Sequence, residues 1–392
     1  MRGTPRFVFA SDSLKGTLSS EDAARLLAAA AERHFPDCLW TAVPMADGGE
    51  GTVDALVSAC GGERVSALVS DPLGRPVEAA YALLPGGRAV IETAAASGLT
   101  LLSPDERDPL ATSTYGTGQL VADALARGAR DVTVALGGSA TNDGGMGLAR
   151  ALGARLLDEE GHELAGRGAD LERVASVDLS GVSPLVAGAR FCMMCDVDNP
   201  LVGPEGASCV FGPQKGAAPA TVRRLDAGMR RWAHVLERAF GRSFDVPGAG
   251  AAGGLGAACL ALLDAEPVSG VARVLELVCF DALLADADLC VTGEGHADAQ
   301  TARGKVVSGV AAACAAAGVP CVAVVGGMSA DAGDMPGLSA MVPTAIDAMS
   351  LEEALGSAEG VSARAAGRLC ALLAVGGTRA GQRSARPPGR DA

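Results

Sequence analysis

The chain has 392 residues, of which 49% are hydrophobic and 20% charged, so it can bury a sizeable core and is not a disordered polypeptide. A formal net charge of −14 and an aromatic content of only 3% argue against nucleic acid as the main partner. Its eleven cysteines show no regular spacing, and we find neither a secretory signal nor an apolar stretch long enough to span a bilayer. We therefore expect a reduced, cytoplasmic protein that does not cross a membrane.

Short apolar runs alternate with alanine- and leucine-rich helical stretches from the start of the chain. The pattern predicts a strand over 7–10, a helix over 23–31, a strand over 39–45 and a glycine-rich loop over 47–52. Ser19 opens the first helix, with Asp22 three residues on at the spacing of a capping box.

The same order of strand, glycine-rich polar loop and helix recurs further along. Strands are predicted over 132–136, 289–292 and 321–325, and each leads into a loop, at 137–147, 293–295 and 326–327. Strands separated by helices predict a parallel sheet, and ligands bind at the carboxyl ends of the strands in open α/β sheets. We therefore expect an α/β fold with its chemistry in these loops.

The first two loops each have a functional and an ordinary interpretation. In residues 12–17, Lys15 could clamp a carboxylate or phosphate at a helix N-terminus, or it could be a solvated lysine in a plain turn. In residues 47–52, Asp47 and Glu50 lie among three glycines. These carboxylates could hold Mg²⁺ or accept a proton, or they could cap the next helix.

Residues 137–147 are the strongest candidate for binding phosphate. Five glycines enclose Ser139, Thr141, Asn142 and Asp143 between a strand and a helix. Such a loop can form a nest of N–H groups beside oxygens that could bind a metal ion. A flexible connector would not need this polar run.

The apolar run 190–195 ends at Asp196, which is therefore a functional candidate at a strand end. Cys192 and Cys195 form a lone C-x-x-C within the run. No second pair follows at the spacing of a zinc knuckle, so we interpret both as core cysteines rather than as a zinc or redox site.

Four further observations narrow the class of protein. Residues 248–253 match G-x-G-x-x-G, but only a poor strand precedes them, which argues against a nicotinamide site and leaves close ligand approach or helix packing. No G-x-x-x-x-G-K-[ST] occurs, so a Walker-type P-loop is excluded. The loop 293–305 carries seven polar side chains after a clear strand, which favours a ligand-binding site there. Of the four scattered histidines only His296 lies in a candidate loop, so no metal triad can be read.

Taken together, these loops resemble those of the type I glycerate kinase family, from about residue 7 to residue 373. The segments that carry the resemblance are SDSLKGTLS from Ser11, PMADGGEGTVDAL from Pro44, GGSATNDGGMG from Gly137, CDVDNPLVGPEGA from Cys195, FGPQKGA from Phe211, PGAGAAGGLGA from Pro247 and TGEGHADAQTARGK from Thr292. Seven motifs in the same order are far more specific than any one of them.

The resemblance implies transfer of phosphate from ATP to D-glycerate with Mg²⁺, giving 2- or 3-phosphoglycerate. It also implies two α/β domains. We expect a Rossmann-like parallel-sheet domain formed by both chain ends, at 1–72 and 285–375, a second α/β domain inserted at 73–284, and a disordered tail at 376–392. His296 and Ala299 depart from the family pattern, which usually has Arg and Gly there. The change removes a fixed cation or makes it pH-dependent, which bears on substrate preference.

Roles follow from residue chemistry and loop position. The expected ATP-binding residues are Gly137, Gly138, Ser139, Thr141, Asn142, Gly144, Gly145 and Lys215. Asp143 or Asp298 would hold Mg²⁺. The expected glycerate-binding residues are Ser13, Lys15, Asp298, Gln300 and Thr301, with Lys15 on the carboxylate. Asp196, or otherwise Asp47, would accept the proton of the glycerate hydroxyl group.

Two other functions fit parts of the sequence. Asp196-x-Asp198 imitates the D-x-D-x-[TV] motif of aspartyl-phosphate phosphatases, although Pro200 stands at the fourth position after the first Asp. A non-catalytic sensor of small acids could use the same fold, with His296 marking lost catalysis.

Overall fold

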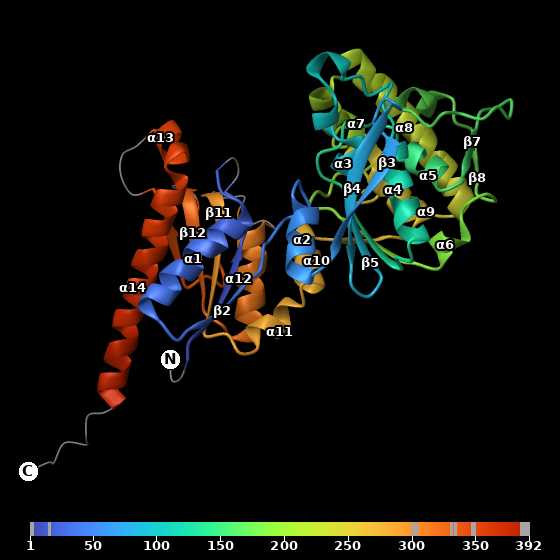
Figure 1. Cartoon of the computed structure of the whole chain (residues 1–392). Coiled ribbons are helices and arrows are strands. Elements are labelled where there is room, and N and C mark those ends of the chain that lie inside the picture. The colour runs from blue at the N-terminus through green and yellow to red at the C-terminus, as the bar shows by residue number, and fades with distance from the viewer. Residues whose placement is uncertain are drawn as a thin grey trace, which may run out of the picture. The chain divides into compact units, whose positions relative to one another are not determined.

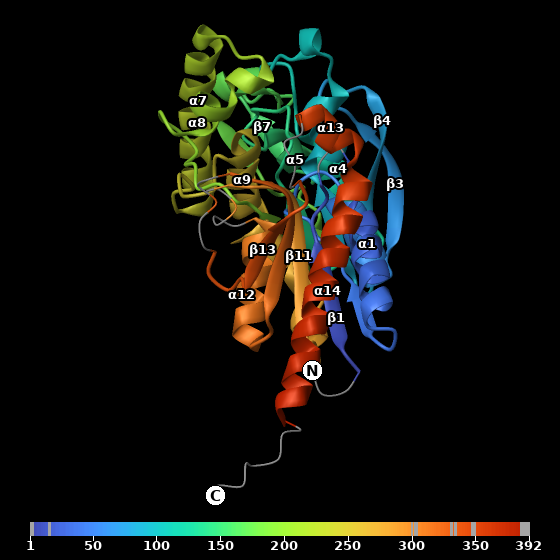
Figure 2. The same ribbon diagram turned by 90° about the vertical axis from the view of Figure 1, so that its left-hand side faces the viewer.

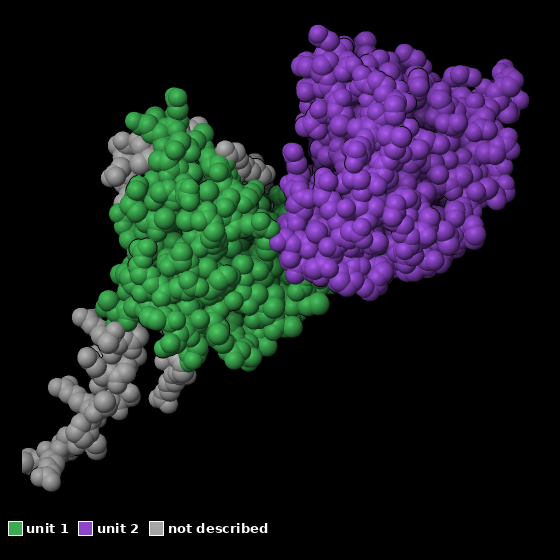
Figure 3. Space-filling model, in the orientation of Figure 1, with its two compact units in different colours: residues 1–47, 274–392 green, residues 48–273 purple. Residues whose placement is uncertain are grey.

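The computed structural model describes residues 4–14, 17–298, 301, 305–329, 332, 335–345 and 350–384. It divides the chain into two compact units: unit 1 comprises Met1–Asp47 and Val274–Ala392, and unit 2 comprises Gly48–Arg273 (Figure 3). In Figure 1, unit 1 therefore carries the blue and the orange-red ends of the colour scale, whereas unit 2 runs from blue through green to yellow. The expected fold class, with one α/β domain built from both chain ends and a second inserted between them, is confirmed.

The boundaries between the units lie after Asp47 and after Arg273, whereas we expected them after residues 72 and 284. Strand β3, Glu63–Ser70, pairs along its whole length with β4, Pro76–Leu84. The two strands of a β-hairpin lie in the same sheet, and β4 belongs to the sheet of unit 2. The segment from 48 to 72 therefore belongs to unit 2.

Unit 1 contains a five-stranded sheet in the order β13-β12-β11-β1-β2, in which every pair is parallel. Its strands are β1 Arg6–Ser11, β2 Leu39–Ala42, β11 Leu289–Ala297, β12 Cys321–Met328 and β13 Ala340–Pro343. Its helices are α1 Ser20–His34, α11 Phe280–Leu284, α12 Val306–Ala317, α13 Leu351–Gly356 and α14 Ala358–Ser384, and α10 Gly270–Leu277 crosses the boundary with unit 2. The β1–β11 ladder joins the two chain ends, from Phe7 opposite Leu289 to Ser11 opposite Gly293.

Helices cover both faces of this sheet. Side chains of α1 and α14 pack with Phe7, Phe9 and Val291, and Figure 2 shows these two helices lying together along the strands. Residues of the other face, such as Ala323 and Val325, pack with Val307 of α12. Burial on both faces explains the near-continuous apolar runs of the strands. The Ser19 hydroxyl accepts a hydrogen bond from the backbone N–H of Asp22 and caps α1 as predicted.

Unit 2 contains a six-stranded sheet in the order β10-β9-β6-β5-β4-β3. Its other strands are β5 Arg88–Glu92, β6 Asp131–Ala135, β9 Arg190–Met194 and β10 Glu266–Val268, and β7 Arg155–Leu157 pairs with β8 Ser176–Asp178 in a separate ribbon. The pairs among β5, β6, β9 and β10 are parallel, whereas β3, β4 and β5 pair antiparallel. The parallel half therefore sets four strand ends side by side at one edge.

Helices and short 3₁₀ turns cover this second sheet. The helices are α2 Thr52–Cys60, α3 Thr93–Ser97, α4 Tyr115–Ala126, α5 Met146–Ala151, α6 Pro184–Ala187, α7 Ala207–Phe211, α8 Pro219–Phe240 and α9 Ala251–Leu262, and the 3₁₀ turns are η1 Leu99–Leu101, η2 Pro104–Glu106, η3 Gly168–Glu172 and η4 Pro213–Lys215. The indole of Trp232, on α8, is fully buried and donates to the carbonyl oxygen of Gly144 at 2.9 Å.

The end of the chain differs from the expectation of a disordered tail over 376–392. Helix α14 continues to Ser384, so residues 376–384 are helical, and 385–392 lie outside the described residues. Among the helices that the structure describes, none is both long enough and apolar enough to cross a lipid bilayer.

Candidate functional site

Four strand ends meet at one edge of the unit 2 sheet. Glu92 of β5 is in register with Ala135 of β6, Ala135 with Met194 of β9, and Met194 with Val268 of β10. The loops that follow these strands therefore begin side by side. This edge brings together the glycine loop after β6 and Asp196 after β9, as the parallel-sheet argument predicted.

Only the first part of the loop at 137–147 is open to a ligand. Gly137 and Gly138 are exposed, whereas every residue from Ser139 to Gly147 is buried. Two backbone hydrogen bonds fix the exposed turn: Leu99 N–H donates to the Gly138 carbonyl at 3.0 Å, and Ala140 N–H donates to the Ser97 carbonyl at 2.8 Å. Gly138 has a φ of +73°, a conformation that a residue with a Cβ rarely adopts.

The Asp143 carboxylate lies inside the protein, where it holds the loop. Its Oδ2 accepts from the Thr114 N–H at 2.7 Å, the Thr114 hydroxyl at 2.8 Å and the Gly147 N–H at 3.1 Å, and its Oδ1 accepts from the Gly145 N–H at 3.0 Å. Burial raises the pKa of Asp143, and these hydrogen bonds oppose that shift. A carboxylate that is buried and satisfied by four donors favours a structural role over the metal ligation that we expected.

Lys215 lies beneath the same loop. Its side chain is buried, and its Nζ donates to the Ser139 hydroxyl at 2.8 Å and to the Thr141 carbonyl at 2.7 Å. Burial lowers the pKa of Lys215 to about 7, while the charge of Asp143 acts to raise it. Lys215 is therefore placed to set the shape of the loop from within.

The other predicted ATP-binding residues also pack inward. The Asn142 amide donates to the Ser208 hydroxyl at 2.9 Å. A Cβ at Gly144 would stand 2.5 Å from the ring of Trp232, and one at Gly145 would stand 2.3 Å from the Cβ of Ala258. These glycines are required for packing. Of the eight predicted residues, only Gly137 and Gly138 are exposed.

Two buried oxygens in the loop are unsatisfied. Within the part of the chain that the structure describes, Thr141 Oγ1 and Asn142 Oδ1 have no hydrogen-bond partner. Buried polar atoms are normally paired with protein or water. This short stretch is therefore the least satisfied part of the loop.

The segment that matches G-x-G-x-x-G has a packing role. A Cβ at Gly253 would stand 2.0 Å from the Thr141 carbonyl oxygen, and Gly253 accepts a hydrogen bond from the Gly144 N–H at 3.0 Å. These glycines let the start of α9 approach the loop closely, in agreement with the packing alternative rather than a dinucleotide site.

Asp196 and Glu92 are the carboxylates at this edge. Asp196 is exposed, and its Oδ1 accepts from the Gly270 N–H at 3.1 Å. Glu92 was missed by our sequence reasoning. Its Oε1 accepts from the Val53 N–H at 2.8 Å, and burial raises its pKa. The rule that identified Asp196, a carboxylate directly after a buried apolar strand, would also have found Glu92.

Of the two cysteines of the lone C-x-x-C, Cys192 lies on β9 and Cys195 directly follows that strand. Cys192 is buried in the sheet, and the Cys195 thiol donates to the Val197 carbonyl at 3.1 Å. Neither belongs to a cluster of three potential ligands among the described residues. Their placement agrees with the interpretation as core cysteines.

Unit 1 has its own group of polar residues at the ends of β1 and β11. Asp12 N–H donates to the Gly293 carbonyl at 2.9 Å, and Ser13 N–H donates to the Asp12 carboxylate at 2.7 Å. Asp47, which ends the first segment of unit 1, is half-buried. Two predicted substrate residues, Lys15 and Gln300, lie outside the described residues.

Thr301 and Lys305 contact Asp298 in this group. Its Oδ1 accepts from the Thr301 N–H at 3.1 Å, its own N–H donates to the Thr301 hydroxyl at 3.0 Å, and Lys305 Nζ lies 3.4 Å from its Oδ1. Lys305 Nζ also lies 4.0 Å from Glu294. Glu294 and Lys305 were not among our predicted site residues, although both lie in the loop that we favoured as a site.

The Glu294 carboxylate is buried and only partly satisfied. Its Oε1 finds no hydrogen-bond partner among the described residues. Burial raises the pKa of Glu294, Thr301 and Lys305 lower it, and the nearby charges of Asp12 and Asp298 raise it further. The ring of His296 lies on the same strand, with Nε2 2.7 Å from the Ser329 hydroxyl.

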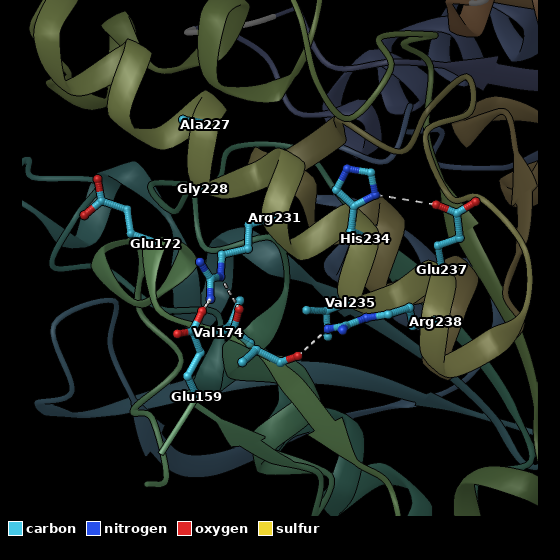
Figure 4. Close-up of a pocket in the computed structure, with 11 residues that line it drawn as sticks. Glu159, Glu172, Val174, Ala227, Gly228, Arg231, His234, Val235, Glu237 and Arg238 are labelled. Carbon is cyan, nitrogen blue, oxygen red and sulfur yellow. Dashed lines mark hydrogen bonds and ion pairs between the residues drawn. The ribbon is translucent and has the colours of Figure 1, made fainter. Parts of the chain in front are cut away.

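An open groove on unit 2 lies away from these residues. Figure 4 shows its lining along α8, where Arg231 donates to the Val174 carbonyl at 2.7 Å and pairs with Glu159 at 2.6 Å. None of the described residues that line it belongs to our candidate set. We therefore place the candidate site at the strand ends and not in this groove.

The fold and these strand ends define an α/β protein whose candidate ligand-binding loops lie at the carboxyl edges of two sheets. The model of the glycerate kinase family matches residues 7–374. The chain is 46% identical to the Halalkalibacterium halodurans protein named Glycerate kinase, over 92% of this chain and 96% of the relative. It is 41% identical to Glycerate 2-kinase of Escherichia coli (strain K12), over 96% of this chain and 100% of the relative.

A crystal structure assigned to glycerate kinase 2 of Salmonella typhimurium LT2 superposes with a TM-score of 0.88 at 42% identity, covering 96% of this chain and 100% of that chain. The chain thus belongs to the glycerate kinase family, as the motifs indicated.

The buried amine of Lys215 predicts a pH-dependent stability. Because burial lowers its pKa from 10.5 to about 7, the unfolded chain binds more protons than the native chain between these values. The cost of burying Lys215 therefore falls as the pH rises through this window. Between pH 7 and 9, the free energy of unfolding of the unaltered chain should rise relative to that of Lys215→Met by up to about 1.4 kcal/mol per pH unit.

Urea unfolding at several pH values measures this difference. Arg150→Met is the control, since an arginine does not titrate in this range and its loss should leave the slope unchanged. Parallel pH profiles for the unaltered chain and Lys215→Met would show that the amine is protonated in the fold.

Proposed function

We propose that this chain is a glycerate kinase, which transfers the γ-phosphate of ATP to D-glycerate and releases ADP. The observation that carries the proposal is membership of the glycerate kinase family over residues 7–374, with curated glycerate kinases at 41–46% identity across most of the chain. The Escherichia coli relative, named Glycerate 2-kinase, supports the 2-hydroxyl group as the acceptor. A cytoplasmic location remains our expectation.

The exposed glycines of unit 2 support binding of the ATP phosphates there. Phosphoryl transfer depends on positioning and charge neutralisation more than on covalent chemistry by the protein. In this proposal Gly137 and Gly138 present their backbone to the phosphates. Lys215 and Asp143 act as positioning residues, because their hydrogen bonds fix the buried half of the same loop.

Mg²⁺ fits Glu294 and Asp298 better than Asp143. Glu294 Oε1 is a buried oxygen without a partner among the described residues, and the neighbouring charges of Asp12 and Asp298 make its ionisation costly. A divalent cation would satisfy that oxygen and offset the like charges. When bound with ATP, Mg²⁺ would neutralise charge on the phosphates.

Asp196 is our proposed general base, with Asp47 as the alternative. Asp196 is exposed at a strand end, where a carboxylate can reach the hydroxyl group of a ligand. Ser13, Thr301, Lys15 and Gln300 are proposed to bind glycerate, the last two from sequence position alone.

Glycerate-dependent release of ADP tests the function. The purified chain with Mg²⁺ and ATP should release ADP only when D-glycerate is added, with phosphoglycerate formed in equal amount. Release of phosphate from an aryl phosphate without ATP would support the aspartyl-phosphate phosphatase instead. Glycerate binding without turnover would support the sensor of small acids.

Asp196→Asn tests the base. Loss of a general base should lower kcat by about a hundredfold or more, while the affinities for glycerate and ATP are nearly kept. Steady-state kinetics with each substrate varied provide the measurement, and Asp198→Asn is the matched control because that carboxylate is also exposed and lies two residues away. A kcat within about threefold of the unaltered enzyme would move the role to Asp47.

Glu294→Gln tests the metal site. Removal of the charge should raise the dissociation constant for the metal ion by about tenfold or more, because even the loss of a residue that only supports a metal ligand weakens metal binding by about that factor. Titration with Mn²⁺ followed by electron paramagnetic resonance, without substrate turnover, measures binding directly. Glu352→Gln, a change at an exposed glutamate of the same unit, should bind Mn²⁺ normally. Equal affinity in both variants would contradict the placement.

A further inference from the structure

Three buried cysteine side chains of unit 1 meet near the amino-terminal ends of β11 and β12. The candidate site residues of this unit lie toward the carboxyl ends of its strands. Cys290 near the start of β11 is in register with Cys321 at the start of β12, and Cys314 lies in the last turn of α12. Their three sulfur atoms all lie within 4.8 Å of one another. Glu294, in contrast, lies nearer the carboxyl end of β11, and Asp298 directly follows that strand. The thiols therefore form a group separate from the candidate site.

The cluster is closed to solvent and surrounded by apolar side chains. All three cysteines have an exposed fraction of 0%. Cys290 and Cys321 share the sheet face of Ala323 and Val325, which packs against Val307 of α12. Hydrogen bonding with Cys314, together with burial, raises the pKa of Cys290, and the two neighbouring S–H groups lower the pKa of Cys314. The three thiols therefore interact with one another as one group.

No charged side chain among the described residues contributes to the pKa shifts of Cys314 and Cys321. For each of these thiols the shift comes from the other two thiols and from burial. The net charge of a bound species therefore decides which species the cluster can hold, because a buried charge without a partner is costly. Three thiolates around Cu⁺ would carry two negative charges, and around Zn²⁺ one. Structural zinc sites also use four ligands, and the cluster supplies three.

A trivalent thiophilic element needs only three sulfur ligands, and with three thiolates it leaves no net charge in the core. Trivalent arsenic forms three bonds to sulfur, and its complex with three thiolates is neutral. As(OH)₃ reacts with three thiols by replacing three As–O bonds with three As–S bonds; the three thiol protons leave with the hydroxide groups as three water molecules. No electron is transferred and no charge is left in the core.

We propose that Cys290, Cys314 and Cys321 form a three-thiol binding site for trivalent arsenic and chemically similar elements. The site ties β11, β12 and α12 together at the end of the sheet away from the candidate active site, and it does not rest on the proposed kinase function.

Intact mass spectrometry of the reduced, folded full chain with sodium arsenite tests the site. We expect one adduct per chain, with the mass of one arsenic atom less three hydrogen atoms. A site with only two thiols would retain one hydroxyl group on arsenic, so the mass separates the two cases. In the unaltered chain, peptide mapping after alkylation should show Cys290, Cys314 and Cys321 protected by arsenite and the exposed Cys279 labelled.

Matched variants locate the adduct. Cys314→Ala and Cys321→Ala should lose the three-thiol mass, while Cys279→Ala and Cys195→Ala, whose thiols lie outside the cluster, should keep it. Circular dichroism checks that each variant folds. If Cys314→Ala or Cys321→Ala does not fold, the peptide map of the unaltered chain shows which cysteines bind arsenic. The absence of a three-thiol adduct in the native chain, labelling of the three cysteines despite arsenite, or an adduct that persists in both core variants would overturn the proposal.

Discussion

The buried hydrogen bonds of Asp143 are the interaction on which the unit 2 site depends. The carboxylate gathers donors from the start of α4 and from its own loop, so the two segments cannot separate without leaving an unpaired buried charge. Lys215 adds a second anchor through Ser139 and Thr141. A loop anchored twice from within presents a fixed turn at its surface, and in our proposal this turn binds phosphate without the cost of ordering it.

Glycine serves a different purpose at each point of this region. Gly138 supplies the left-handed backbone of the exposed turn, whereas Gly144 and Gly253 lack side chains because Trp232 and the Thr141 carbonyl occupy that space. The same glycine-rich composition that predicted a nest of N–H groups therefore also builds a tightly packed interior behind the exposed turn. Close packing of this kind accounts for a glycine-rich segment that is almost wholly buried.

Sequence reasoning succeeded where a one-dimensional pattern carries the information. Alternating strands and helices predicted the parallel edge, and the end of a buried apolar run placed Asp196 at that edge. It could not tell which polar residues of the loop face solvent, because Asn142 and Asp143 find their partners in segments distant along the chain. The same holds for Cys290 and its neighbours, which the fold of unit 1 brings together.

Buried hydrogen bonds hold the inner part of the loop at 137–147, which is exposed only at Gly137 and Gly138. Amide hydrogen exchange with and without Mg·ATP tests this arrangement residue by residue. We expect the amides of residues 142–147 to be strongly protected before nucleotide is added, and Mg·ATP to add protection at residues 137–139. Fast exchange across 142–147 in the free protein, followed by protection of that whole segment on binding, would contradict it and show instead a loop that folds around its ligand.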